Sequence, residues 1–211
     1  MKEYKLPIGC DVPETIILAD GDFPSHPLAL EWLRQCPYVV CCDGAANTYI
    51  RSGRMPEAIV GDGDSLLPDI KERYASLIHS ETEQETNDLS KAFRFCLSQE
   101  RKRITIMGAT GKREDHTIGN VSLLADYMEQ AEVSMVTDYG IFVPIREDSM
   151  FESYIGQQIS VFNMNSTALS AEGLAYPLSV FTNWWQGTLN EALARHFIIR
   201  TEGKVLVFRV F

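Results

Sequence analysis

Two aspartates, Asp62 and Asp64, follow the short apolar run Ala58–Val60 and are separated by one glycine. Alternate side chains of an extended segment point to the same side, so the two carboxylates can converge on one point. Like charges held this close cost free energy unless a cation neutralises them, and ligation by oxygen alone favours Mg²⁺. The pair therefore predicts a magnesium site at the rim of an α/β sheet, and magnesium there indicates phosphate chemistry. The competing interpretation is a polar turn with solvated aspartates.

A further acidic position and a glycine loop extend this chemistry. Asp88 opens a predicted helix, where it is either an ordinary first-turn acid or a third oxygen ligand for the metal. The segment Gly108–His116 joins a predicted strand to a predicted helix and can present backbone N–H groups to a phosphate. It is not a Walker A loop, because Ile106 and Arg113 stand where that motif requires Gly and Ser or Thr. Arg113 can instead bind phosphate through two hydrogen bonds, whereas His116 is either a capping or surface histidine or a nucleotide contact.

A pair of tryptophans, Trp184 and Trp185, lies far along the chain from these motifs. Paired tryptophans usually pack in a core or an interface, but they can also form a flat wall against a heteroaromatic or cationic ring. In the second case, Thr188 and Asn190 would supply hydrogen bonds to the same ligand. The sequence leaves both interpretations open.

The first two thirds of the chain alternate short apolar runs with helical patterns, which is typical of a parallel sheet covered on both faces. The predicted strands are Thr15–Ala19, Tyr38–Cys42, Ala58–Val60 and Ile104–Met107, and the predicted helices are Pro27–Gln35, Ala45–Arg51, Asn87–Ser98 and Ile118–Glu129. Asp43, Asp62 and Gly108 each follow the carboxyl end of a predicted strand. Because open α/β sheets bind ligands outside those ends, we expect the motifs to meet at one rim.

From about residue 133 the pattern changes to short strands punctuated by glycines, without convincing helices between them, which predicts an all-β module. The predicted strands are Val133–Val136, Ile141–Val143, Gln158–Phe162, His196–Ile199 and Val205–Phe208. We therefore predict an α/β protein with an N-terminal Rossmann-like parallel-sheet domain over residues 1–140 and a C-terminal all-β sandwich over residues 141–211. Since about 70 residues is small for independent stability, we expect docking or dimerisation.

The composition limits the partners and the compartment. The formal net charge of −10 over 211 residues argues against nucleic acid or an anionic membrane as a partner, but not against ATP, because metal ions can mask carboxylates. The cysteines are odd in number and form no C-x-x-C, so we expect buried free thiols and a reducing, cytoplasmic location. The sequence shows neither a signal-peptide pattern nor an apolar run of the roughly 20 residues that a membrane span needs.

Taken together, the motifs occur in a specific order from about Asp20 to the C-terminus. They are D-G-A at Asp43–Ala45, P-x-x-I-V-G-D-x-D-S over Pro56–Ser65, the acidic helix start at Asp88, G-A-T-G-x-R-x-D-H over Gly108–His116 with Asn120, and G-L-x-Y-x-L over Gly173–Leu178. Each piece is weak alone, but the ordered set resembles the thiamine pyrophosphokinase family.

The resemblance implies that residues 1–140 form a Rossmann-like parallel-sheet catalytic domain, which binds ATP and magnesium. It also implies a homodimer in which the C-terminal sandwich binds thiamine near the subunit interface. The implied reaction converts ATP and thiamine into AMP and thiamine diphosphate with Mg²⁺. The family's metal-binding acids fall on Asp62, Asp64 and Asp88, and Asp43 falls on a further catalytic position. Its nucleotide-binding positions fall on Ser65, Gln84, Gly108, Thr110, Gly111, Arg113, Asp115 and His116, and its thiamine-binding end on Trp185, Thr188 and Asn190.

The chain departs from the family pattern at two places. The usual D-x-T-D appears as Glu85–Asp88, where the last acid is kept and Asn87 still provides a helix cap. The usual S-x-S-N appears as Gly187–Asn190, where both serine positions lack a hydroxyl. The alternatives that stay open are a pyrophosphokinase for another hydroxymethyl heterocycle such as a pterin, a non-catalytic thiamine- or nucleotide-binding module, and a magnesium-dependent phosphohydrolase.

Overall fold

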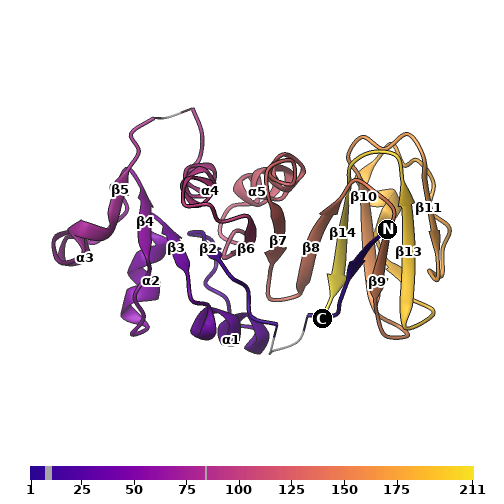
Figure 1. Ribbon diagram of the computed structural model, residues 1–211, viewed down its shortest axis with the longest axis horizontal. Coiled ribbons are helices and arrows are strands. Elements are labelled where there is room, and N and C mark those ends of the chain that lie inside the picture. The colour runs from indigo at the N-terminus through magenta and orange to yellow at the C-terminus, as the bar shows by residue number, and fades with distance from the viewer. Residues whose placement is uncertain (8–10, 84) are drawn as a thin grey trace.

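A parallel sheet forms one half of the molecule (Figure 1). The computed structural model describes residues 1–7, 11–83 and 85–211. The parallel strands run in the order β7-β6-β2-β3-β4-β5. Their bounds are β2 (Ile16–Leu18), β3 (Val39–Cys42), β4 (Ala58–Gly61), β5 (Ile78–Ser80), β6 (Arg103–Met107) and β7 (Glu132–Val136). The prediction of a Rossmann-like parallel sheet is confirmed.

Helices cover both faces of this sheet, with α4 and α5 on one face and α1 and α2 on the other (Figure 1). The helices are α1 (Pro27–Gln35), α2 (Ala45–Arg51), α3 (Pro68–Arg73), α4 (Asp88–Ser98) and α5 (Glu114–Tyr127), with short 3₁₀ turns η1 (Ala75–Leu77) and η2 (Trp184–Gly187). Local sequence fixes their starts: Pro27 occupies the first turn of α1, and the Asn87 side chain accepts a hydrogen bond from the Ser90 N–H of α4 at 3.0 Å. An apolar core therefore lies on each side of the strands.

The sandwich half continues the same sheet rather than starting a separate one. Strand β8 pairs antiparallel with β7 and is followed across the sheet by β14, β10 and β12. A second sheet, in the order β1-β9-β13-β11, packs against it (Figure 1). The bounds are β1 (Lys2–Tyr4), β8 (Gly140–Ile145), β9 (Ser149–Glu152), β10 (Gln158–Asn163), β11 (Leu169–Glu172), β12 (Asn190–Glu191), β13 (His196–Thr201) and β14 (Val205–Val210). The predicted small β-sandwich is confirmed.

Three details differ from the sequence pattern. The strand at Val133–Val136, grouped with the all-β module, is instead the last parallel strand, β7, and pairs with β6. Helix α5 begins at Glu114 rather than at Ile118, so the end of the glycine loop forms its first turn. The N-terminal strand β1 joins the sandwich by pairing with β9. The sequence did not predict this strand, because three residues are too few to show the alternation of apolar and polar side chains that marks a strand.

Buried thiols accompany the core, as expected. Cys41, Cys42 and Cys96 are buried and free, and Cys36 is free and half-buried. Burial raises the pKa of the Cys96 thiol to about 12, so this side chain behaves as a small apolar residue. Cys10 lies outside the described residues. Among the described residues, no helix is long and apolar enough to cross a membrane.

Candidate active site

The strand order reverses between β2 and β6, and the loops that follow these two strands meet there. The backbone N–H of Gly21 donates to the Gly108 carbonyl at 2.6 Å, and that of Asp22 donates to the Thr110 carbonyl at 2.8 Å. A Cβ on Gly21 would lie 2.3 Å from the Thr110 carbonyl oxygen, so only glycine permits this approach. Such a reversal is the position at which open α/β sheets bind ligands.

Three carboxylates converge at the ends of the neighbouring strands β3 and β4. Oxygen atoms of Asp43, Asp62 and Asp64 all lie within 4.8 Å of one another. Asp43 follows β3, and its N–H donates to the Val60 carbonyl of β4 at 2.9 Å, which holds the two strand ends together. A Cβ on Gly61 would lie 2.8 Å from the Cβ of Asp43, so the glycine makes room for this approach. We call Asp43, Asp62 and Asp64 the acidic cluster.

Asp43 is the buried member of the acidic cluster, with 3% of its surface exposed. Its Oδ2 atom accepts a hydrogen bond from the Ser65 N–H at 3.1 Å, whereas Oδ1 is buried without a partner among the described residues. Burial, together with the nearby carboxylates of Asp88, Asp64 and Asp62, raises the pKa of Asp43 to about 6 despite the opposing Ser65 hydrogen bond. Oxygen-only donors and a buried unsatisfied carboxylate fit a hard divalent cation.

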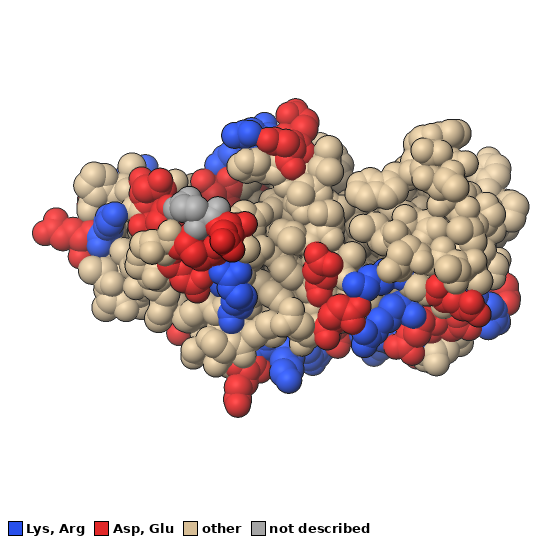
Figure 2. All heavy atoms as spheres, turned by 90° about the horizontal axis from the view of Figure 1, so that it is seen from above, with Lys and Arg blue, Asp and Glu red and all other residues tan. Residues whose placement is uncertain are grey.

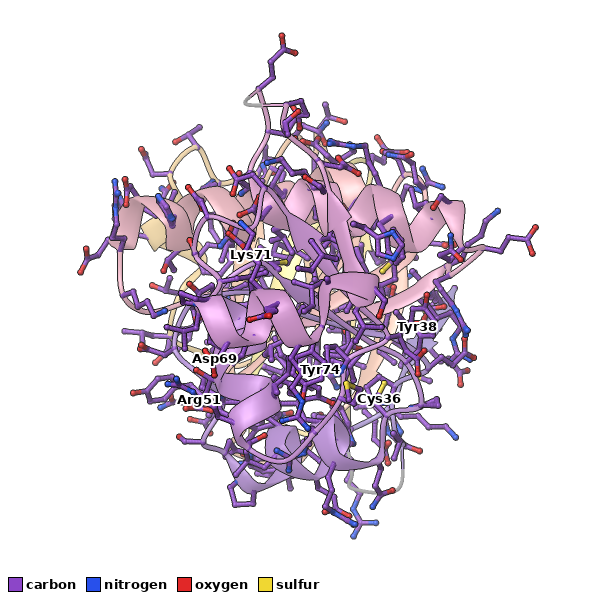
Figure 3. The ribbon with its side chains drawn as sticks, turned by 90° about the vertical axis from the view of Figure 1, so that its left-hand side faces the viewer. Cys36, Tyr38, Arg51, Asp69, Lys71 and Tyr74 are labelled. Atoms are coloured by element: carbon purple, nitrogen blue, oxygen red, sulfur yellow. The ribbon has the colours of Figure 1, made fainter. Side chains whose placement is uncertain are left out.

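Two side chains that the sequence analysis did not single out fix the loop carrying Asp62 and Asp64. Lys71, on the upper side of α3 in Figure 3, donates to the Gly63 carbonyl at 2.7 Å. Asn47 of α2 donates to the Ser65 carbonyl at 2.8 Å and accepts from the Leu67 N–H at 3.0 Å. Within the loop, the Asp64 N–H donates to Asp62 Oδ1 at 3.2 Å, and the Ser65 hydroxyl donates to Asp64 Oδ1 at 3.2 Å. The sequence offered one signal that could have pointed to Asn47, because this residue lies two positions after Ala45 of the D-G-A motif.

Asp88, expected as the third metal ligand, lies beside the acidic cluster but outside the three converging carboxylates. It begins α4, as predicted, and its Oδ1 atom accepts a hydrogen bond from the Lys91 ammonium at 3.0 Å. Its charge still reaches the cluster, since it contributes to the raised pKa of Asp43. The structure thus groups Asp43 with Asp62 and Asp64, and pairs Asp88 with a lysine.

The predicted nucleotide-binding loop carries its charged side chains on the surface. Arg113 forms two hydrogen bonds to Asp115, Nε to Oδ1 at 3.1 Å and Nη2 to Oδ2 at 2.5 Å, with both side chains more than 60% exposed. The hydrogen bonds from Arg113 hold the pKa of Asp115 below its usual value. The N–H of His116 also donates to Asp115, at 3.0 Å. Gly108 and Gly111 adopt the left-handed conformation that turns this loop. Gln84 lies outside the described residues.

A small hollow lies at the strand reversal and exposes two further charged groups. Its volume is about 120 Å³, and it is lined by Ala19, Asp20, Gly21, Asp22, Phe23, Ala45, Thr48 and Lys112. The Lys112 ammonium donates to the Asp20 carbonyl at 2.9 Å and to Asp20 Oδ1 at 3.1 Å. Neither Asp20 nor Lys112 was among the site residues predicted from the sequence. Both groups stand where the loops after β2 and β6 meet.

The tryptophan pair lies on η2, at the opposite half of the molecule from the acidic cluster. Trp184 is 43% exposed and packs edge-on against Phe162 of β10, with ring centroids 6.0 Å apart. Trp185 is 73% exposed. A Cβ on Gly187 would lie 1.8 Å from the Val161 carbonyl oxygen, so the turn is pressed against β10. The structure therefore separates the roles of the two rings: one packs on the sandwich, and the other projects from it.

The two polar residues expected beside these rings make internal hydrogen bonds. The Thr188 hydroxyl donates to the Trp185 carbonyl at 2.7 Å. Asn190 is 4% exposed; its Oδ1 accepts from the Tyr176 and Glu191 N–H groups, and its Nδ2 donates to the Tyr176 carbonyl at 2.8 Å. Asn190 therefore joins two segments of the sandwich, and Thr188 closes the turn.

Comparison with known proteins assigns each half of the chain to a family model. Residues 29–137 match the family model described as "Thiamin pyrophosphokinase, catalytic domain", and residues 140–208 match "Thiamin pyrophosphokinase, substrate-binding domain". The chain belongs to the thiamin pyrophosphokinase family. Within this family, the acidic cluster falls in the catalytic-domain match, and the tryptophan turn falls in the substrate-binding match.

Individual relatives support the same assignment at modest identity. Thiamine pyrophosphokinase 1 of Oryza sativa subsp. japonica is 30% identical over 129 residues, which span 49% of this chain and 49% of the relative. Thiamine pyrophosphokinase of Bacillus subtilis (strain 168) is 33% identical over 86 residues, which span 39% and 40% of the two chains. The chain thus matches half or less of the length of these relatives.

Solved structures share the fold across nearly the whole chain. Thiamin pyrophosphokinase from Candida albicans superposes with a TM-score of 0.79 at 17% identity, covering 100% of this chain and 92% of that one. The Bacillus subtilis thiamine pyrophosphokinase structure gives a TM-score of 0.78 at 21% identity, covering 93% and 98%. At these identities the likeness establishes the common architecture of catalytic half and sandwich.

Proposed function

We propose that this protein transfers the pyrophosphoryl group of ATP to the hydroxyl of thiamine, giving thiamine diphosphate and AMP. The observation that carries the proposal is the acidic cluster at the carboxyl ends of β3 and β4, in a chain whose two halves match the family's catalytic and substrate-binding models. The cluster supplies a cation site, and the loops after β2 and β6 supply a place for phosphates. The domain division at about residue 140 is part of this proposal.

Asp43, Asp62 and Asp64 would hold Mg²⁺, which supplies charge neutralisation to the phosphate oxygens when bound. The backbone of the Gly108–Gly111 loop and the Lys112 ammonium face the strand reversal and would contact the nucleotide phosphates. Arg113 would exchange its two hydrogen bonds to Asp115 for equivalent bonds to phosphate.

The chemistry then requires position and charge more than a dedicated nucleophile. The oxygen of the thiamine hydroxyl forms a bond to the β-phosphorus while the bond between that phosphorus and the AMP oxygen breaks. The hydroxyl proton leaves to a carboxylate at the rim. Loop N–H groups and basic side chains stabilise the charge that develops on the transferred group.

The acceptor end of the proposal rests on exposed apolar side chains of residues 174–193. Trp185 offers a flat face to the aromatic rings of thiamine. In the same stretch of chain, large apolar side chains between 43% and 77% exposed are Tyr176, Val180, Trp184, Leu189 and Leu193. Figure 2 shows a broad uncharged area over the sandwich, whereas acidic side chains gather over the parallel-sheet half. We propose that a second copy of the chain covers this surface and completes the thiamine site, in a cytoplasmic homodimer.

A turnover assay tests the function directly. Purified protein is incubated with ATP and Mg²⁺, with and without thiamine, and AMP and thiamine diphosphate are quantified. AMP that forms only with thiamine supports the proposal. Phosphate release without an acceptor would select a phosphohydrolase, AMP formed with a hydroxymethyl pterin but not with thiamine would select another pyrophosphokinase, and thiamine binding without AMP would select a non-catalytic module. Light scattering of the same sample, compared with Leu189→Arg, tests the homodimer.

A further inference from the structure

Lys91 is a buried lysine at the edge of the proposed metal site. It is 3% exposed and lies one helical turn after Asp88 on α4, with its Nζ atom 3.0 Å from Asp88 Oδ1. Helix α4 packs against β3 and β4, whose ends carry Asp43 and Asp62. Burying an ammonium group is costly unless a carboxylate pairs with it. The pair therefore joins a buried ammonium group to a half-exposed carboxylate at the rim.

The surroundings supply counter-ions for this ammonium. The Asp88 carboxylate lies 3.0 Å from the Lys91 Nζ atom, and the charge of Asp62 also attracts it, so the buried positive charge is compensated. Two other cations lie in this region: Arg94 of α4 is engaged with Glu81 and Glu83 at 3.0 and 2.9 Å, and Lys71 of α3 donates to the Gly63 carbonyl at 2.7 Å. Lys91 is thus the buried positive charge that acts on both Asp88 and the acidic cluster.

We propose that Lys91 is a positioning residue that serves as an internal counter-ion of the acidic rim: it holds Asp88 beside the acidic cluster, and its charge opposes the binding of a free divalent cation to that cluster. This inference rests on the magnesium site of the proposed function. Because a fixed positive charge repels a metal ion but attracts phosphate, free metal binds weakly and a metal–nucleotide complex binds well. The site is thereby biased toward accepting its cation together with the nucleotide.

The experiment measures metal binding and stability without any turnover. Parent protein, Lys91→Met, Lys91→Arg and Lys204→Met are freed of metal, and Mn²⁺ binding is measured by electron paramagnetic resonance with and without a non-hydrolysable ATP analogue. Lys204→Met is the matched control, since it removes the same charge and an ion pair of similar length, Lys204–Glu129 at 2.9 Å, which joins the start of β14 to the segment after α5. Lys91→Arg keeps the charge.

We expect Lys91→Met to bind free Mn²⁺ about tenfold more tightly than the parent, because a repelling unit charge at the rim has been removed. We expect Lys91→Arg and Lys204→Met to match the parent. The unfolding temperature of Lys91→Met should fall by several degrees in EDTA and recover in saturating Mg²⁺, because the metal replaces the missing counter-ion.

Two outcomes would overturn the inference and are distinguishable. Equal Mn²⁺ affinity in the parent and Lys91→Met, with a stability loss that Mg²⁺ does not repair, would show that Lys91 only packs. A parent protein that binds no Mn²⁺, even with the nucleotide analogue, would overturn the metal site itself and this inference with it. If Lys91→Met fails to fold, the double variant Asp88→Asn/Lys91→Met removes both charges and must still bind free Mn²⁺ more tightly than Asp88→Asn alone.

Discussion

The acidic cluster and the tryptophan turn are built in opposite ways. At the cluster, buried backbone from β3 and β4 fixes three carboxylates within 4.8 Å, and the buried Oδ1 of Asp43 is left without a partner among the residues that the structure describes. At the tryptophan turn, Thr188 and Asn190 form their hydrogen bonds within the sandwich, and the side chain of Trp185 is 73% exposed.

This difference shows what each region lacks. The cluster holds like charges that repel one another, so it gains free energy from a cation. The turn holds apolar area, so it gains free energy from an aromatic ligand or an apolar partner surface. The proposed function therefore assigns a hard ion to one half of the molecule and a ligand or a partner surface to the other half.

Replacing a carboxylate of the cluster should produce the largest effect. Asp62→Asn removes a charged metal ligand and should lower the rate of AMP formation at least a thousandfold, or about 4 kcal/mol, while the circular dichroism spectrum stays unchanged. The rate is measured at saturating ATP, Mg²⁺ and thiamine. The matched control is Asp69→Asn on α3, an exposed acid labelled in Figure 3 that lies outside the cluster and should keep full activity. Near-parental turnover by Asp62→Asn would exclude the cluster as the metal site.

Neutralising Asp43 should stabilise the metal-free protein. Its pKa of about 6 exceeds the ordinary 3.8, so the folded state binds a proton that the unfolded state releases, and stability falls as pH rises through this window. Asp43→Asn should therefore raise the free energy of unfolding at pH 7.5 in EDTA by about 2 kcal/mol and have little effect near pH 4. Asparagine also tolerates the φ of 32° at this position.

Urea unfolding at both pH values measures the effect of Asp43→Asn. Saturating Mg²⁺ should reverse the order, making the parent more stable than the variant, because the metal binds the ionised carboxylate. An unchanged stability difference between pH 4 and pH 7.5 would show that the Asp43 carboxyl titrates normally.

Replacing Asn190 should reveal a structural residue in the sandwich. Asn190→Ala removes buried hydrogen bonds to the backbone of Tyr176 and Glu191 and should lower the free energy of unfolding by about 2 kcal/mol. Because its polar atoms are already engaged, the KM for thiamine should change less than threefold at a temperature where the variant is folded. A large rise in KM with unchanged stability would assign Asn190 to the ligand instead.

The smallest effect should separate the two tryptophans. Trp185→Ala should raise the KM for thiamine about tenfold, or 1.4 kcal/mol, with little change in stability, because its ring projects into water. Trp184→Ala should mainly lower the unfolding temperature, because its ring packs against Phe162. Steady-state kinetics and thermal unfolding of both variants measure this contrast, and the reverse pattern would exchange the roles of the two rings.

The sequence predicted most of the residues at the rim of the parallel sheet, but not which of their side chains lie against one another. Asp43, Asp62 and Gly108 were predicted to meet because each follows a parallel strand, and that rule needs no tertiary knowledge. It did not reveal that Asp43, rather than Asp88, completes the converging group, since the approach depends on how β3 and β4 end beside each other. It also missed Lys71 and Asn47, whose contacts with the loop at 63–65 join separate elements.

By itself, the sequence determined the architecture and the family of this protein, because periodicity, glycine placement and acidic motifs are local properties of the chain. The tertiary structure decided what the local pattern leaves open. It determined which carboxylates converge and that a lysine pairs with Asp88. It also determined that Asn190 forms hydrogen bonds with the backbone and that one continuous sheet joins both halves. The physical reason is that burial and long-range hydrogen bonds set the state of a polar group. Neither burial nor a long-range partner can be read from a residue's neighbours along the chain.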